Sequence, residues 1–138
     1  LKYERVKYFF KRKKKYDKDI EEFNSILKNH LYLDSLDLLK KENFFLDVYI
    51  VSASFSEIIE PFCVNMLNVN LITNNLDTYS SASDINFKNK IEALKSNIER
   101  DYTIIRGYGN SAGDYDFMEI STQAFLRLPN GQYEIWKK

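Results

Sequence analysis

The chain has 138 residues, 44% of them hydrophobic, and its 20 Lys and Arg residues balance its 20 Asp and Glu residues. This length suffices for one domain with an apolar core but not for two ordinary domains. The composition is that of a globular chain, which excludes general disorder. The zero net charge excludes a global attraction to nucleic acid or to acidic lipid.

Targeting and redox signals are sparse. The single cysteine, Cys63, rules out an internal disulfide framework and suits a reducing compartment. No apolar run approaches the ~20 residues of a membrane span, and no signal peptide is visible. We therefore expect a cytoplasmic protein without a membrane partner. Because the chain begins at Leu1 within an amphipathic pattern, we expect it to be an internal part of a longer protein.

Helices are predicted for the first forty-odd residues, because apolar side chains recur there at helical spacing. Asp17 and Ser35 are the predicted N-caps of the second and third of these helices. The apolar positions on which this prediction depends are Val6, Phe9, Phe10, Ile20, Phe23, Ile26, Leu27, Leu36 and Leu39.

From Phe45 onwards, predicted strands alternate with predicted helices, which indicates right-handed βαβ units and a parallel sheet. A loop or a small hairpin is expected at 76–83, Asn86 is the expected cap of the helix that follows, and the turn at 129–131 is expected to close the domain. Strands are expected at 46–51, 69–73, 102–106 and 124–128, and helices at 58–67 (with a short turn at Pro61), 87–98 and 114–121.

Small polar residues follow the first of these strands. Ser52 and Ser54 are placed at its carboxyl end, where a hydroxyl and free backbone N–H groups can hold a phosphate. The alternative is that small polar residues simply end the strand. A serine nucleophile is disfavoured, because the only imidazole is His30, in the helical part.

The segment 107–116 carries candidate cation ligands after an apolar run. Asp114 offers a carboxylate, which suits Mg²⁺, and Asn110 offers an amide oxygen. Asp116 points about 200° away from Asp114 around a helix, so the two do not serve one ion. The alternative for Asp114 is an N-cap.

Two lysines, Lys88 and Lys90, fall in the first turn of a predicted helix, where positive charge opposes the helix dipole. That mild cost points to an anionic partner, although a solvated lysine is the simpler interpretation of either residue alone. The basic run Lys11–Lys15 could bind nucleic acid, but acidic residues follow at once, and we interpret it as a solvated helix end or loop.

Taken in order, several segments resemble the haloacid dehalogenase (HAD) superfamily, in its phosphoserine-phosphatase-like branch. The segments are Val51-Ser52-Ala53-Ser54, Ile59-Glu60-Pro61, Leu71-Ile72-Thr73, Lys90-Ile91-Glu92-Ala93-Leu94 and Gly109-Asn110-Ser111-Ala112-Gly113-Asp114. The resemblance implies a Rossmann-like, three-layer α/β fold with a parallel sheet. Residues 1–43 then correspond to an incomplete helical cap and residues 44–138 to a core that lacks its first strand.

The resemblance also implies a Mg²⁺-dependent phosphomonoesterase that works through an aspartyl-phosphate. Ser52 then binds the transferring phosphoryl group, Lys90 (or, as second choice, Lys88) stabilises its charge, and Asn110 and Asp114 hold Mg²⁺. Positioning and charge neutralisation are what phosphoryl transfer requires. The implied partner is a small phosphorylated metabolite rather than nucleic acid.

Two departures separate the chain from that family. The Asp-x-Asp nucleophile motif has no match after a buried strand, since Asp17-Lys18-Asp19 follows the lysine run instead. Asn110 stands where the family has an aspartate, which removes one negative charge beside the cation. The expected explanation is that an upstream segment carries the nucleophile. The alternative is a catalytically inactive binding or regulatory module of the same fold. Substrate identity and oligomeric state are not readable from the sequence.

Overall fold

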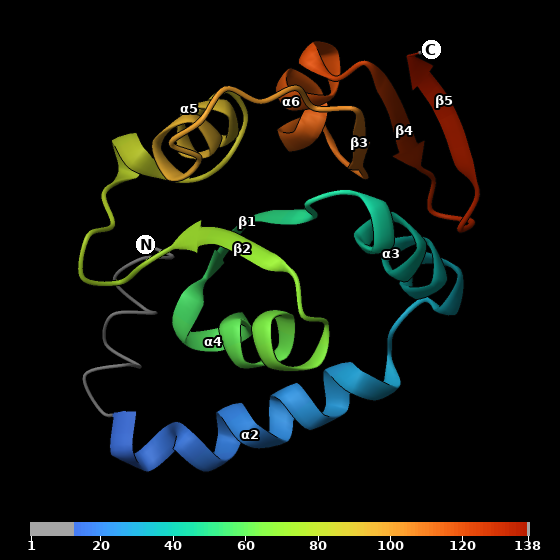
Figure 1. Ribbon diagram of the computed structural model, residues 1–138. Coiled ribbons are helices and arrows are strands. Elements are labelled where there is room, and N and C mark those ends of the chain that lie inside the picture. The colour runs from blue at the N-terminus through green and yellow to red at the C-terminus, as the bar shows by residue number, and fades with distance from the viewer. Residues whose placement is uncertain (1–12, 138) are drawn as a thin grey trace. The chain divides into compact units, whose positions relative to one another are not determined.

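The computed structural model of the protein describes residues 13–137 and is a mixed α/β structure (Figure 1). The chain divides into two compact units, one formed by residues up to Ile50 together with Ser54–Thr78, the other by Val51–Ala53 together with Tyr79–Lys138. The predicted mixture of strands and helices is confirmed. The complete three-layer sheet, and the division into a cap at 1–43 and a core at 44–138, stay predictions.

Helices α2 (Lys13–Asn29) and α3 (Leu33–Phe45) belong to the first unit. Both predicted N-caps are wrong. Asp17 lies inside α2, because lysines are good helix formers and the helix includes part of the basic run. Ser35 lies inside α3, whose N-cap is Tyr32 and whose first turn carries the favourable negative charge of Asp34.

The face that α2 buries also differs from the prediction. Phe23 and Ile26 are 42% and 49% exposed, while Asn24 is buried. The Asn24 amide donates hydrogen bonds to the carbonyls of Ile20 (2.8 Å) and Ile58 (3.1 Å). A polar side chain therefore ties α2 to α4 (Ser56–Glu60), which lies alongside it (Figure 1). Val6, Phe9, Phe10 and the first part of the basic run lie outside the described residues.

Strand β1 spans Tyr49–Phe55 and forms a two-stranded sheet with β2 (Asn70–Asn74). The prediction for β2 is correct to within one residue, whereas β1 lies further along the chain than expected. Ser52 and Ser54 are consequently strand residues rather than residues after its end. The strand continues because Phe55 is buried and because the Ser54 carbonyl accepts a hydrogen bond from Thr73 Oγ1 at 2.5 Å. Most of β1 is half-buried, not buried on both faces.

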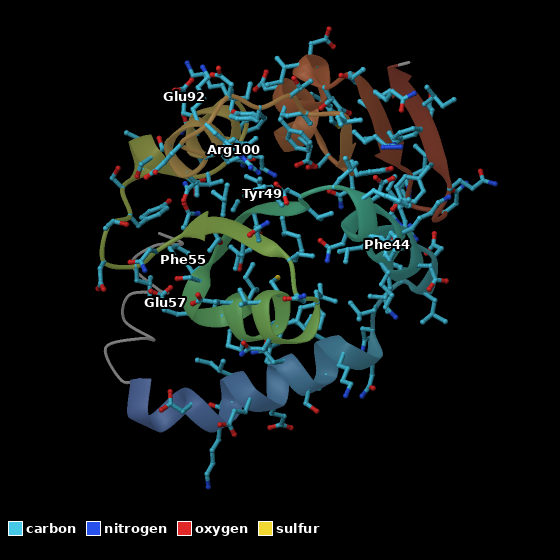
Figure 2. The ribbon with its side chains drawn as sticks, in the orientation of Figure 1. Phe44, Tyr49, Phe55, Glu57, Glu92 and Arg100 are labelled. Carbon is cyan, nitrogen blue, oxygen red and sulfur yellow. The ribbon has the colours of Figure 1, made fainter. Side chains whose placement is uncertain are left out.

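The change of helix type at Pro61 follows from its missing N–H. Helix α4 gives way there to the π-helix η1 (Pro61–Met66), which carries the buried Phe62 and Cys63. Burial raises the pKa of the Cys63 thiol, which keeps it protonated and apolar. Glu57, at the start of α4, accepts a hydrogen bond from the Leu76 amide at 3.2 Å and so holds the chain that leaves β2 (Figure 2).

The loop predicted at 76–83 is confirmed and contains only the 3-10 turn η2 (Ser81–Ser83). Helix α5 (Asn89–Asn97) begins later than predicted, and Lys88, not Asn86, is its N-cap. Phe87 has a φ of 47°, in the left-handed region, so it cannot be the first residue of a right-handed helix. Leu94 is the buried residue of the predicted apolar face, and Ile91 and Ile98 are half-buried.

In the second unit, β3 (Arg106–Gly109) pairs parallel with β4 (Gln123–Arg127), which pairs antiparallel with β5 (Tyr133–Lys137). The 3-10 turn η3 (Ala112–Asp114) and helix α6 (Tyr115–Ile120) connect β3 to β4. The three strands lie side by side, and α6 packs against them (Figure 1). Expectations for α6 and β4 are confirmed within about one residue.

Two expectations in this region are wrong. The strand predicted at 102–106 begins only at Arg106. The turn at 129–131 forms as predicted, but it leads into β5 instead of closing the domain.

Two glycines of β3 explain its unexpected position. A Cβ on Gly107 would overlap Ser121 Oγ, and a Cβ on Gly109 would lie 2.5 Å from Asp114 Cβ and 2.6 Å from Met118 Sδ. Met118 is fully buried and cannot move aside. The strand therefore forms where glycines let α6 approach closely, not where the strand propensity of the chain is highest. No helix within residues 13–137 is both long enough and apolar enough to cross a bilayer.

We expect Gly107→Ala to destabilise the protein by about 1–3 kcal/mol, because the new methyl overpacks the contact with Ser121. Ser121→Ala alone should cost about 0.5–1.5 kcal/mol, since it removes the hydrogen bond to the Phe117 carbonyl. The double variant should be more stable than the sum of the two changes, as measured by urea unfolding. Strict additivity would contradict the packing described for β3 and α6.

Candidate functional site: a buried lysine–aspartate pair

The centre of the candidate site is an ion pair between Lys90 and Asp114. Lys90 is the second residue of α5, and Asp114 ends η3 at the start of α6. Lys90 Nζ lies 2.5 Å from Asp114 Oδ1, and each residue is only 7% exposed. A lysine in the first turn of a helix opposes the helix dipole, so burial there requires an anion close by. Asp114 provides that anion.

The second oxygen of the Asp114 carboxylate is bound by the preceding loop. Oδ2 accepts hydrogen bonds from the amides of Asn110 (3.0 Å) and Ser111 (3.2 Å), and from Ser111 Oγ (3.3 Å). Ser111 and Asp114 form a capping box at η3. Asp114 is the N-cap residue of α6 by position, as the sequence allowed, but its side chain makes no cap hydrogen bond there. Instead, the side chain serves both the capping box of η3 and the ion pair with Lys90.

Opposing effects act on the protonation of Asp114. Burial alone raises the pKa of its carboxyl group. The hydrogen bond and charge of Lys90, together with the amides of Asn110 and Ser111, lower that pKa by more than burial raises it. The net pKa lies below the ordinary aspartate value. Asp114 is therefore ionised at neutral pH, and Lys90 has a permanent counter-charge.

Lys90 also reaches the middle of β1. Its Nζ donates a hydrogen bond to the Val51 carbonyl at 3.2 Å and lies 5.7 Å from the centre of the Phe117 ring. The Val51 carbonyl belongs to the peptide group that precedes Ser52, and Val51–Ala53 are part of the second unit. The structure thus brings the backbone at Ser52 to the Lys90–Asp114 pair. Ser52 itself is half-buried.

Other predicted residues lie outside this arrangement. Lys88 is exposed, and it is Lys90, not Lys88, that contacts Asp114. Asn110 is exposed and contributes its backbone amide to Asp114. Asp17 and Asp19 are exposed residues of α2 in the first unit, so their Asp-x-Asp spacing lies on a helix and not at the end of a strand.

Sequence reasoning missed two components of the site. The Val51 carbonyl carries no side-chain signal, and nothing in the sequence marks a backbone oxygen as a lysine partner. The Ser111–Asp114 capping box could have been found, because a serine followed three residues later by an acidic residue is a known signature of this motif.

The Mg²⁺ ligation predicted for Asp114 and Asn110 stays a prediction. Asp114 accepts one hydrogen bond at Oδ1 and three at Oδ2, so a cation at Oδ1 would share that oxygen with Lys90. Within residues 13–137 no group of three or more His, Cys, Asp or Glu residues could hold a metal ion. Asn110, which is exposed, still fits the role of a single oxygen ligand.

Comparison of the chain with protein-family models, with curated proteins and with solved structures gives no match. The likeness to HAD proteins is therefore a resemblance carried by the residues quoted above.

We expect Asp114→Ala to lower the free energy of unfolding by about 3–5 kcal/mol, because it leaves the Lys90 ammonium buried without a counter-charge. The double variant Lys90→Met/Asp114→Leu, which removes both charges, should recover most of that loss. Urea unfolding of the variants would measure both effects. Equal losses in the single and double variants would show that packing rather than charge matters here.

The ion pair should also make stability depend on pH in one direction. Because the folded-state pKa of Asp114 lies below its unfolded-state value, its stabilisation is complete above about pH 4 and is lost as pH falls through the folded-state pKa. The difference in unfolding free energy between the natural protein and Asp114→Asn should thus narrow in acid. Urea titrations at about pH 7 and about pH 3 would measure it. A pH-independent difference would contradict this assignment.

Proposed function

We propose that the chain is part of a Mg²⁺-dependent phosphomonoester hydrolase of the HAD type, namely the part that follows the nucleophile motif, with the nucleophilic aspartate outside this chain. The observation that carries this proposal is the contact of Lys90 with both Asp114 and the Val51 carbonyl. It supports a single locus shared by three segments that the resemblance assigns to one active site, namely those around Ser52, Lys90 and Asp114.

The chemistry assigned to these residues is positioning and charge neutralisation. In the proposed reaction the phosphoryl group passes from the ester oxygen to the first aspartate of the upstream Asp-x-Asp motif, and the second aspartate of that motif gives its proton to the leaving alcohol. The second aspartate then takes a proton from water, which attacks the aspartyl-phosphate, releases phosphate and regenerates the nucleophile. The Lys90 ammonium balances charge on the phosphoryl oxygens, and the Ser52 hydroxyl donates to one of them. Asp114 supplies the counter-charge of Lys90 and fixes the direction of its side chain.

A finer description of the fold belongs to the same proposal. The parallel pair β3–β4 supports a Rossmann-like, three-layer parallel sheet of the HAD type, completed by an upstream strand that carries the nucleophile. Residues 1–43 would then form part of a helical cap. The substrate would be a small phosphorylated metabolite in the cytoplasm, without nucleic acid or membrane as a partner.

Magnesium enters the proposal through the resemblance. When bound, it would supply positive charge to the phosphoryl oxygens. Asn110 would contribute an amide oxygen, and further ligands would come from the upstream nucleophile segment. Asp114 contacts Lys90 in the arrangement described above, and its role as a second Mg²⁺ ligand stays a prediction.

A second candidate is a catalytically inactive module with the same fold. The saturation of the Lys90–Asp114 pair favours it. Nζ is buried between Asp114 and the Val51 carbonyl, and both Asp114 oxygens have partners, so the pair is satisfied without a ligand. An asparagine at position 110 also weakens cation binding relative to a carboxylate.

The test uses the protein together with its upstream sequence and measures phosphate release from small phosphomonoesters with and without Mg²⁺. Lys90→Met should lower kcat by about 100-fold or more, because it removes a charge that stabilises the transition state. Lys95→Met is the matched control: Lys95 lies on the same helix but is exposed, as is its partner Glu92 (Figure 2).

Equal activity in the Lys90 and Lys95 variants would remove Lys90 from the mechanism. A folded natural protein that releases no phosphate from any of these esters would favour the inactive module.

A further inference from the structure

A close contact joins the loop before α5 to the loop before α6. Gly113 is buried, and a Cβ at this position would overlap the side-chain oxygen of Asn86. The Asn86 oxygen is fixed in turn, because it accepts a hydrogen bond from the Phe87 amide at 3.1 Å. The Phe87 amide also donates to the Gly113 carbonyl at 3.1 Å. One N–H group therefore holds both sides of the contact.

The backbone at Phe87 is strained by this arrangement. Its φ of 47° lies in the left-handed region, which is a genuine outlier for a bulky side chain. Such a conformation persists only when the surrounding contacts fix it. The ring does not provide these contacts, since Phe87 is 52% exposed. The hydrogen bonds of its backbone, to Asn86 and Gly113, are what hold it.

Both ends of this contact lead directly to the ion pair. Gly113 is bonded to Asp114 in the chain, and the Phe87 carbonyl accepts a hydrogen bond from the Lys90 amide at 3.1 Å. The distance between the Lys90 and Asp114 backbones is therefore set by backbone and glycine contacts that do not involve the two charged groups.

We infer that Asn86 and Gly113 are positioning residues: the Asn86–Gly113 clamp sets the alignment of Lys90 with Asp114. As far as catalysis is concerned, this inference rests on the proposed phosphatase function. Neither residue touches the reacting atoms, and both act through Lys90. The clamp predicts that glycine is required at 113 because of Asn86, not because of backbone conformation.

The decisive variant is Gly113→Ala, whose methyl must either displace the Asn86 side chain or separate the two loops. In the protein with its upstream sequence, kcat should fall by up to about 100-fold, with little change in KM, because a misplaced charge acts on the transition state. Asn86→Ala removes the overlapping oxygen. The double variant Asn86→Ala/Gly113→Ala should therefore regain most of the lost kcat.

A matched glycine control separates positioning from general destabilisation. Gly131 has a φ of 86°, so Gly131→Ala is also destabilising, but it lies in the turn between β4 and β5. Its urea midpoint should fall while kcat stays at the natural value. A Gly113→Ala variant whose kcat also stays at the natural value would overturn the inference.

A second measurement does not depend on catalysis. A double-mutant cycle of Lys90→Met and Asp114→Asn, read from urea unfolding, gives the coupling between the two charged residues. This coupling should shrink in the Gly113→Ala background, return in the Asn86→Ala/Gly113→Ala background and stay unchanged in the Gly131→Ala background. An unchanged coupling in the Gly113→Ala background would overturn the clamp. A natural protein without phosphatase activity would instead overturn the proposed function. The Asn86–Gly113 clamp would then be tested by the double-mutant cycle alone.

Discussion

A lysine ammonium group withdrawn from water at the start of a helix is the constraint on which the second unit depends. Removing Lys90 from solvent is costly, and the α5 dipole adds to that cost. Asp114 offsets it only if its carboxylate stays ionised and fixed, which the Ser111 hydroxyl and the loop amides ensure. Asp114 in turn lies against β3, where only a glycine at 109 leaves room. One electrostatic requirement thus determines a loop, a glycine and a helix start.

The sequence was most informative where a local pattern and the tertiary structure agree. Strand β2, helix α6 and strand β4 lie within about one residue of their predicted positions. Strand β3 was misplaced because apolar residues at 102–105 have higher strand propensity than the glycine-rich segment that pairs with β4. Its position depends on how closely α6 can approach. The sequence of β3 alone does not show this position, because it depends on the residues of α6 that pack against the strand.

In the candidate site, too, some features could be predicted from the sequence and others could not. The anomaly of a lysine in a first helical turn correctly pointed to an anionic partner, and the structure supplies Asp114. The choice of Lys90 over Lys88, however, depends on which side of α5 faces the interior. Backbone groups such as the Val51 carbonyl leave no trace in a sequence, because every residue has one. The metal ligation predicted for Asp114 stays a prediction, and the loop amides that bind its carboxylate are backbone groups of the same kind.

The membership of Val51–Ala53 in the second unit has a consequence for how the polypeptide assembles. These residues are separated along the chain from the rest of their unit by Ser54–Thr78, so the intervening stretch must be looped out before they can join it. Loop closure of this kind costs entropy before any contact repays it. Synthesis from the N-terminus also delivers the central part of β1 to the folding chain well before Lys90 emerges. The Val51 carbonyl therefore cannot accept its hydrogen bond from Lys90 until that later part of the chain has been synthesised.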